Sequence, residues 1–154
     1  MEQSSTVVLG WREWVCLPGF GIPRLRAKID TGARSSALHV DRQWRLVDGG
    51  APWVGFSLTP LRTRPTEHVE VLAPIHAERE VMDSGGHRTT RIFLLTRLQL
   101  AGIDCMIEIN LANRRGMRFP MLLGRSAMAD TFMVDPARSS IHGRNPHFLQ
   151  DSST

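Results

Sequence analysis

Asp30, Thr31 and Gly32 follow one another and are the residues whose types are best suited to catalysis in this chain. The run before them, residues 25–29, alternates apolar and basic side chains and predicts a short strand that ends at the acid. Gly32 permits a tight turn and the close approach of another backbone, and Thr31 places a hydroxyl beside the carboxylate. The pattern predicts a carboxylate held rigidly at the end of a strand, which suits general acid–base chemistry.

A second segment, residues 119–125, is apolar and ends in Gly124 and Arg125, and helix-prone residues follow it as far as Asp130. In this order the two segments resemble the retropepsin-like aspartic proteases, in which an apolar-apolar-Gly-Arg strand passes behind the catalytic turn. The resemblance implies that Leu123, Gly124 and Arg125 support the Asp-Thr-Gly turn.

The chain alternates short apolar runs with Gly- and Pro-containing turns, which predicts many short strands. Residues 98–109 form a hairpin pattern around Ala101 and Gly102, and only Gly124–Asp130 looks helical. We therefore expect an all-β, closed retropepsin-like acid-protease barrel with one short C-terminal helix. The expected strands are Thr6–Leu9, Glu13–Leu17, Leu25–Ile29, Trp53–Leu58, Glu67–Leu72, Arg91–Leu95, Leu98–Leu100, Cys105–Ile109, Met121–Leu123 and Phe132–Val134.

The length of 154 residues predicts one domain. We expect a flexible N-terminus over residues 1–5, the protease domain over 6–143 and a frayed tail over 144–154. No apolar run is long enough to cross a bilayer, and no secretory signal is apparent. Cys16 and Cys105 are widely spaced and fit buried thiols in a reducing compartment, although a disulfide stays open. Cytoplasmic residence is the default expectation.

The net charge is +4 and the isoelectric point is near 10.4. Lys28 is the single lysine, so nearly all of the positive charge is arginine. Arginine binds carboxylates and phosphates through two parallel hydrogen bonds, and this favours an anionic partner unless the bias reflects codon usage alone. Since the only adjacent basic pair is Arg114-Arg115 and the chain has no tyrosine, an acidic peptide is favoured and no direct nucleic-acid binding is expected.

The resemblance extends over residues 6–143, including the stretches 10–15, 27–39, 114–125 and 132–135. Over this length the chain resembles a bacterial family described as ATP-dependent zinc proteases, whose members are similar in fold to retropepsins. Some of these accompany the ATP-grasp ligase that adds glutamates to a small-subunit ribosomal protein. The resemblance implies an aspartic endopeptidase that acts on glutamate-rich tails, such as those of a ribosomal protein.

Peptide hydrolysis by aspartic proteases needs two carboxylates that share one proton, because like charges about 3 Å apart cannot both ionise. The sequence offers one well-formed acid turn, at Asp30. Since retropepsins take the second acid from a symmetric partner chain, a homodimer is implied. Asp83, followed by Ser84 and Gly85, is a competing second acid that would allow a monomeric enzyme, but its polar surroundings favour a loop.

Ala33 is small, which leaves room for a substrate backbone, and Arg34, Lys28 and Arg118 are candidates for binding substrate carboxylates. The alternative for Arg34 is a solvated surface arginine. Because Arg34 stands where viral retropepsins often place an acid, Arg125 needs another partner, and the candidates are Asp130, Asp135 or a terminal carboxylate. A covering flap is expected around residues 62–65 or 84–86.

No metal or cofactor is predicted. His76 begins a His-Ala-Glu-Arg-Glu stretch that lacks a second histidine at zinc-ligand spacing, and no Gly-rich loop ending in Gly-Lys-Ser/Thr is present. Two alternatives to the aspartic peptidase stay open. One is a non-catalytic binding module whose arginines hold acidic protein segments, and the other is a zinc-dependent peptidase.

Overall fold

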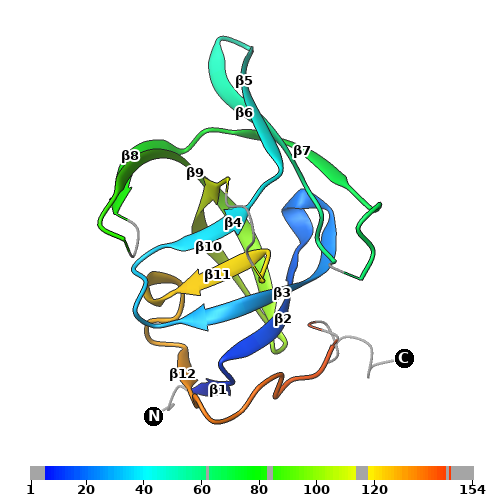
Figure 1. Cartoon of the computed structure of the whole chain (residues 1–154), viewed down its shortest axis with the longest axis vertical. Coiled ribbons are helices and arrows are strands. Elements are labelled where there is room, and N and C mark those ends of the chain that lie inside the picture. The colour runs from blue at the N-terminus through cyan, green and yellow to red at the C-terminus, as the bar shows by residue number, and fades with distance from the viewer. Residues whose placement is uncertain (1–5, 62, 83–84, 114–117, 145, 147–154) are drawn as a thin grey trace, which may run out of the picture.

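The computed structural model describes residues 6–61, 63–82, 85–113, 118–144 and 146. Within these residues nearly all of the regular secondary structure is β-strand (Figure 1). Two 3-10 helices, η1 (Pro18–Phe20) and η2 (Arg125–Ala127), interrupt them. The strands are β1 (Val7–Leu9), β2 (Arg12–Leu17), β3 (Ile22–Asp30), β4 (Ser36–His39), β5 (Arg42–Asp48), β6 (Ala51–Leu58), β7 (Val69–Pro74), β8 (Ala77–Met82), β9 (Arg88–Leu100), β10 (Ile103–Ala112), β11 (Met121–Gly124) and β12 (Phe132–Val134).

The central sheet has the strand order β10-β4-β11-β3-β2-β9-β8, and β10 also pairs with β9. The pairings therefore return to β10 and close the sheet on itself, with the β2–β9 link made by the pair Cys16↔Gln99. A separate sheet, β5-β6-β7, carries the long β5–β6 hairpin at one end of the molecule, and the parallel pair β1–β12 lies at the opposite end (Figure 1).

Alternating apolar residues explain why the closed sheet has a core. Along β3, Leu25, Ala27 and Ile29 are buried while the residues between them are more exposed, as expected for a strand with one face inward. The fully buried side chains Phe56, Leu94 and Leu98 extend this core towards β6 and β9. Burial of this apolar surface is the main force that holds the strands together.

The hairpin predicted over residues 98–109 is confirmed, because β9 pairs antiparallel with β10 from Ile103↔Leu100 onward. Ala101 and Gly102 both have positive φ, 54° and 77°. These are the dihedral signs of a type I′ turn, whose twist matches that of the flanking strands.

The all-β class is confirmed, but three strands and the helix differ from expectation. β4 was missed because all four of its residues are buried, so it shows no alternation. β5 and β8 were missed because they are rich in exposed charged residues. The helix predicted over Gly124–Asp130 is wrong beyond one 3-10 turn, since Asp130 takes a left-handed conformation (φ 70°) and the chain turns back into β12.

The N-terminus 1–5 and nearly all of the tail after residue 144 lie outside the described residues, so the flexibility predicted for them stays a prediction. In the part of the chain that the structure describes, no helix is long and apolar enough to cross a membrane. The cysteines of this part are both free: Cys16 is buried and Cys105 is half-buried.

Candidate active site

Asp30 is the last residue of β3, and a tight turn follows it. The amide of Ala33 donates to the carbonyl oxygen of Asp30 at 3.2 Å, which closes the turn. The amide of Gly32 donates to Oδ1 of Asp30 at 3.1 Å, which fixes the carboxylate against the turn. Asp30 is half-buried, whereas Thr31 and Gly32 are exposed. The acid is thus oriented by its own backbone and still open to a second molecule.

Strand β11 lies behind this turn in parallel register with β3, and Gly124 is the partner of Asp30. A Cβ on Gly124 would lie 2.5 Å from the carbonyl carbon and oxygen of Ser35. Only glycine fits at this point without moving one of the two backbones. Leu123, which precedes it, is fully buried and fixes β11 in the core. The structure therefore places Leu123 and Gly124 behind the turn.

Arg125 holds the turn from its outer side. Its amide donates to the carbonyl oxygen of Ala33 at 2.8 Å, and its guanidinium Nη1 lies 3.3 Å from the carbonyl oxygen of Gly32 and 3.5 Å from that of Thr31. Among the described residues Arg125 pairs with neither Asp130 nor Asp135, and the terminal carboxylate, the third predicted partner, lies outside them. Carbonyl oxygens take the place of an acid, because the turn itself presents them to the guanidinium.

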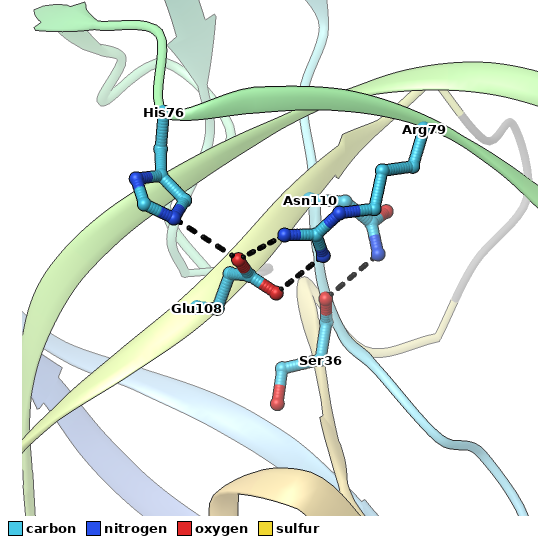
Figure 2. Close-up of polar contacts among 5 residues, drawn as sticks. All are labelled: Ser36, His76, Arg79, Glu108 and Asn110. Carbon is cyan, nitrogen blue, oxygen red and sulfur yellow. Dashed lines mark hydrogen bonds and ion pairs between the residues drawn. The ribbon is translucent and has the colours of Figure 1, made fainter.

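A buried hydroxyl and a buried amide anchor the strand that leaves the turn. Ser36 Oγ accepts a hydrogen bond from the Gly124 amide at 3.0 Å. Asn110 Nδ2 donates to the Ser36 carbonyl oxygen at 2.9 Å, and Asn110 Oδ1 accepts from Arg91 at 3.1 Å. Figure 2 shows Asn110 reaching from β10 to Ser36 on β4. Ser36 therefore ties β4 to β11 through its hydroxyl and to β10 through its carbonyl.

Next to Asn110 on the same strand, Glu108 forms a more exposed ionic group (Figure 2). Arg79 of β8 donates two hydrogen bonds of 2.7 Å to the two oxygens of Glu108, and His76 Nε2 lies 3.3 Å from Oε2. The hydrogen bonds from Arg79 hold the pKa of Glu108 below its ordinary value, although partial burial acts in the opposite direction. This group fastens β8 across the outer face of β10.

An open pocket of about 580 Å³ lies between the turn, η2 and β12. Its polar side chains come from the turn and from η2, and the rest of its lining is apolar. The lining residues are Thr31, Arg34, Arg125, Ser126, Met128, Ala129, Phe132, Met133 and Val134. An exposed apolar surface thus lies immediately beside the acid turn.

The predicted substrate-binding residues differ in their exposure and in where they lie relative to the turn and the pocket. Arg34 is exposed and lines the pocket beside Arg125, and Ala33 is half-buried within the turn. Lys28 is exposed two positions before Asp30 on β3. Arg118 is exposed and makes no hydrogen bond or ion pair with the described residues, so its role stays a prediction.

Other predicted groups lie outside this arrangement. Asp83 and Ser84, the competing second acid and its neighbour, are not among the described residues, and neither is residue 62 of one candidate flap. Within the described residues, no group of three or more His, Cys, Asp or Glu side chains could hold a metal ion.

Sequence reasoning missed Ser36 and Asn110. Ser36 is the first residue of β4 and follows the acid turn closely. A serine at such a position is as common in loops as in strands. Asn110 stands inside an apolar strand, and a lone polar residue in such a run is the one signal that could have marked it, since buried polar groups need partners.

A closed β-sheet that presents an Asp-Thr-Gly turn, with a Gly-Arg strand packed behind it, defines the retropepsin-like class of proteins. Residues 8–145 match the RimB-like family, which is described as the retropepsin-like aspartic endopeptidase RimB. The chain belongs to this family.

The similar proteins fall into two groups. Curated relatives described as probable alpha-L-glutamate ligases include those of Desulfotalea psychrophila (37% identical, 84% of this chain and 28% of the relative) and Parasynechococcus marenigrum (34% identical, 86% and 28%). The chain therefore spans less than a third of the length of these relatives. A crystal structure of Lpg0085 from Legionella pneumophila, described as of unknown function, has a TM-score of 0.74 and 27% identity, over 90% of this chain and 99% of that one.

Proposed function

We propose that this protein is an aspartic endopeptidase in which Asp30 supplies half of a catalytic dyad. The observation that carries the proposal is the Asp30 carboxylate itself, oriented by the Gly32 amide, half-exposed, and held from behind by Gly124. A binding surface has no need for a carboxylate fixed in this way. Membership of the RimB-like family supports the same chemistry.

The second acid of the dyad comes from another copy of the chain. In a dyad one carboxylate is ionised and activates water, while the protonated one polarises the scissile carbonyl. No hydrogen bond or ion pair joins Asp30 to a second acid within the described residues. A two-fold dimer that brings the two exposed turns together supplies the missing group.

An apolar surface beside the turn fits such a dimer. Val8 of β1 and Met133 of β12 are register partners, and they are 41% and 61% exposed. Met133 also lines the pocket beside Thr31. Contiguous exposed apolar surface of this kind is typical of interfaces between subunits. In the dimer the Thr31 hydroxyls hydrogen-bond between the turns.

The substrate is a glutamate-rich peptide, such as the tail of a ribosomal protein. The excess of arginine and the exposed Arg34 and Lys28 near the acid favour a negatively charged chain. Several relatives are described as probable alpha-L-glutamate ligases, and an enzyme that shortens glutamate chains is the chemical counterpart of one that makes them. The protein acts in the cytoplasm and needs no metal or cofactor.

The test compares the parent protein with Asp30→Asn on a peptide that ends in ten glutamates, with products read by mass spectrometry. We expect cleavage by the parent and none by Asp30→Asn, because an amide cannot exchange the proton. Asp48→Asn, the same change at the exposed end of β5, should cleave as the parent does. The specific activity should rise with protein concentration if the site needs two chains.

Each alternative has its own outcome. Undiminished cleavage by folded Asp30→Asn rejects the aspartic mechanism. Activity that is lost with chelator and returns with zinc points to a zinc-dependent peptidase instead. Binding of the peptide by the parent without any cleavage leaves a non-catalytic module that holds acidic segments.

A further inference from the structure

Two groups of cations among the described residues differ in their surroundings. Arginines of the first group pair with carboxylates, as in Arg45–Glu78, Arg79–Glu108 and Arg97–Asp104. The second group lies on the outer face of the paired strands β2 and β3. It also includes Arg144, which follows β12 in the chain and lies beside Trp14 of β2. These cations form no ion pair with any described residue. We call this surface the basic face; it consists of Arg12, Trp14, Arg24, Arg26, Lys28 and Arg144.

The register of the two strands explains why these side chains share one face. Arg12 is the partner of Lys28, and Trp14 is the partner of Arg26. Side chains alternate between the faces of a strand, and the intervening residues of β3, such as Leu25 and Ala27, are buried. The cations at positions 24, 26 and 28 therefore form a row along β3.

Trp14 lies at the centre of the basic face. The guanidinium carbons of Arg26, Arg24 and Arg144 lie 4.7, 5.3 and 6.0 Å from its ring centroid. Cation–π contacts of this kind let like charges gather around one ring. They do not supply the missing anion, because an aromatic ring carries no net charge.

The electrostatics of the basic face indicate that an anion would be favourable there. Burial, together with the charges of Arg12 and Arg144, lowers the pKa of Arg26. The Nε atoms of Arg12 and Arg26 are buried and have no hydrogen-bond partner among the described residues. Glu13, the acid of β2, points to the other face and accepts hydrogen bonds from the amides of Gly10 and Ile141. The crowded positive charges are relieved by a bound carboxylate.

We propose that the basic face binds an extended acidic peptide and leads it along β3 to the catalytic turn. The row of cations at positions 24, 26 and 28 continues at the next alternate position with Asp30 itself. Alternate side chains of an extended peptide are about 6.6–6.8 Å apart, the same spacing as alternate residues of a strand. Every second glutamate of the substrate can therefore meet one cation of the row. This inference rests on the proposed function, since it makes the row part of the peptidase's substrate path.

A peptide fits the basic face better than a single-stranded nucleic acid does. Recognition of a single-stranded nucleic acid depends on open aromatic faces on which the bases stack. Three guanidinium groups already lie against Trp14, so a base would have to displace them. Carboxylates instead need the outward edges of those guanidinium groups, which pair with two oxygens at once.

The test measures binding without catalysis. Fluorescein-labelled deca-glutamate is titrated into Asp30→Asn protein, which cannot cleave it, and the change in anisotropy gives Kd. The double variant Arg24→Gln/Lys28→Gln, made in the same background, should raise Kd roughly five- to twenty-fold, as expected for two partly exposed charge contacts. The matched control is Arg42→Gln/Arg88→Gln, which removes two exposed charges from elsewhere and should change Kd less than about two-fold. The double variant in the Asp30 parent should show a raised KM with kcat nearly unchanged.

Equal Kd values for the double variant and its control overturn the proposal, and so does a poly-uridine oligonucleotide of equal charge that binds the face more tightly than the peptide. These outcomes do not affect the proposed function, which depends on cleavage by the Asp30 parent. If the parent cleaves nothing but the double variant still weakens peptide binding, the basic face stands as a binding surface and the peptidase assignment fails.

Discussion

Gly124 of β11 lies opposite Asp30 of β3 in parallel register, and its missing side chain leaves room for the backbone of Ser35. This close contact between Gly124 and Ser35 fixes how near the acid turn lies to β11. The position of the carboxylate is thus decided by a residue 94 positions away in the sequence, which touches no substrate.

Replacement of Gly124 by alanine should therefore damage both stability and activity. The added Cβ would lie 2.5 Å from the Ser35 carbonyl, so a backbone must shift. We expect a loss of about 1–3 kcal/mol in the free energy of unfolding and a fall in peptidase activity of about 100-fold, since small misplacements of catalytic groups are costly. Thermal unfolding and peptide cleavage measure the two effects.

The control is Gly19→Ala, where the only atom near an added Cβ is the Thr96 hydroxyl oxygen at 3.2 Å and no backbone atom is close. It should change the melting temperature little and leave activity intact. If Gly124→Ala keeps full activity, the close approach of β11 does not position the acid.

Ser36→Ala removes the acceptor of the Gly124 amide. Because Ser36 is fully buried, the amide is left without a partner, which costs about 1–3 kcal/mol of stability. Urea unfolding should show this loss, while Ser126→Ala, at an exposed position of η2, should not. A stability equal to that of the parent would mean that the Ser36–Gly124 hydrogen bond contributes nothing.

Much of this arrangement could be predicted from the sequence. The Asp30 turn and the Gly124–Arg125 strand were predicted together because each carries a local signature, a glycine turn or an apolar run. Ser36 and Asn110 were not predicted, because their roles depend on contacts across 88 and 74 positions. For Arg125, sequence reasoning looks for an acid as the partner and cannot see that the turn directs its carbonyl oxygens at the guanidinium.

Arg125→Lys tests that carbonyl contact. A guanidinium can reach the carbonyl oxygens of Thr31 and Gly32 at the same time, whereas an ammonium is a single point of charge. We expect a fall in kcat of roughly ten-fold from a looser turn with a change in melting temperature below about 2 °C, because Arg125 is exposed. Arg138→Lys, also exposed, should change neither. An unaltered kcat in Arg125→Lys would show that the guanidinium does not hold the turn.

Glu108→Gln should lower the melting temperature in a pH-dependent way. The pKa of Glu108 is lowered in the folded state by hydrogen bonds from Arg79, so the charged form stabilises the fold. This stabilisation is present above the ordinary carboxyl pKa of 4.5 and is lost as the pH falls through the lowered pKa of the folded state. We expect a deficit of about 1–4 °C at neutral pH.

The deficit should shrink below pH 4.5 and then disappear, as scanning calorimetry across a pH series can show. Glu70→Gln, an exposed acid on β7, is the matched control and should show no deficit at any pH. A deficit in Glu108→Gln that is constant with pH would point to packing rather than to the ionic group with Arg79.

The two cysteines should react slowly with alkylating agents while the protein is folded. Burial raises the pKa of both Cys16 and Cys105, and the charge of Asp104 raises that of Cys105 further. The thiolate is the reactive form, so at pH 7.5 iodoacetamide should label both residues at least roughly ten-fold more slowly than free glutathione. Labelling in denaturant should remove the difference, since both pKa values then return to normal.

Mass spectrometry of labelled peptides follows each thiol separately. Rapid labelling of Cys16 in the folded protein, or recovery of a disulfide-linked peptide pair, would contradict a buried Cys16 and two free thiols.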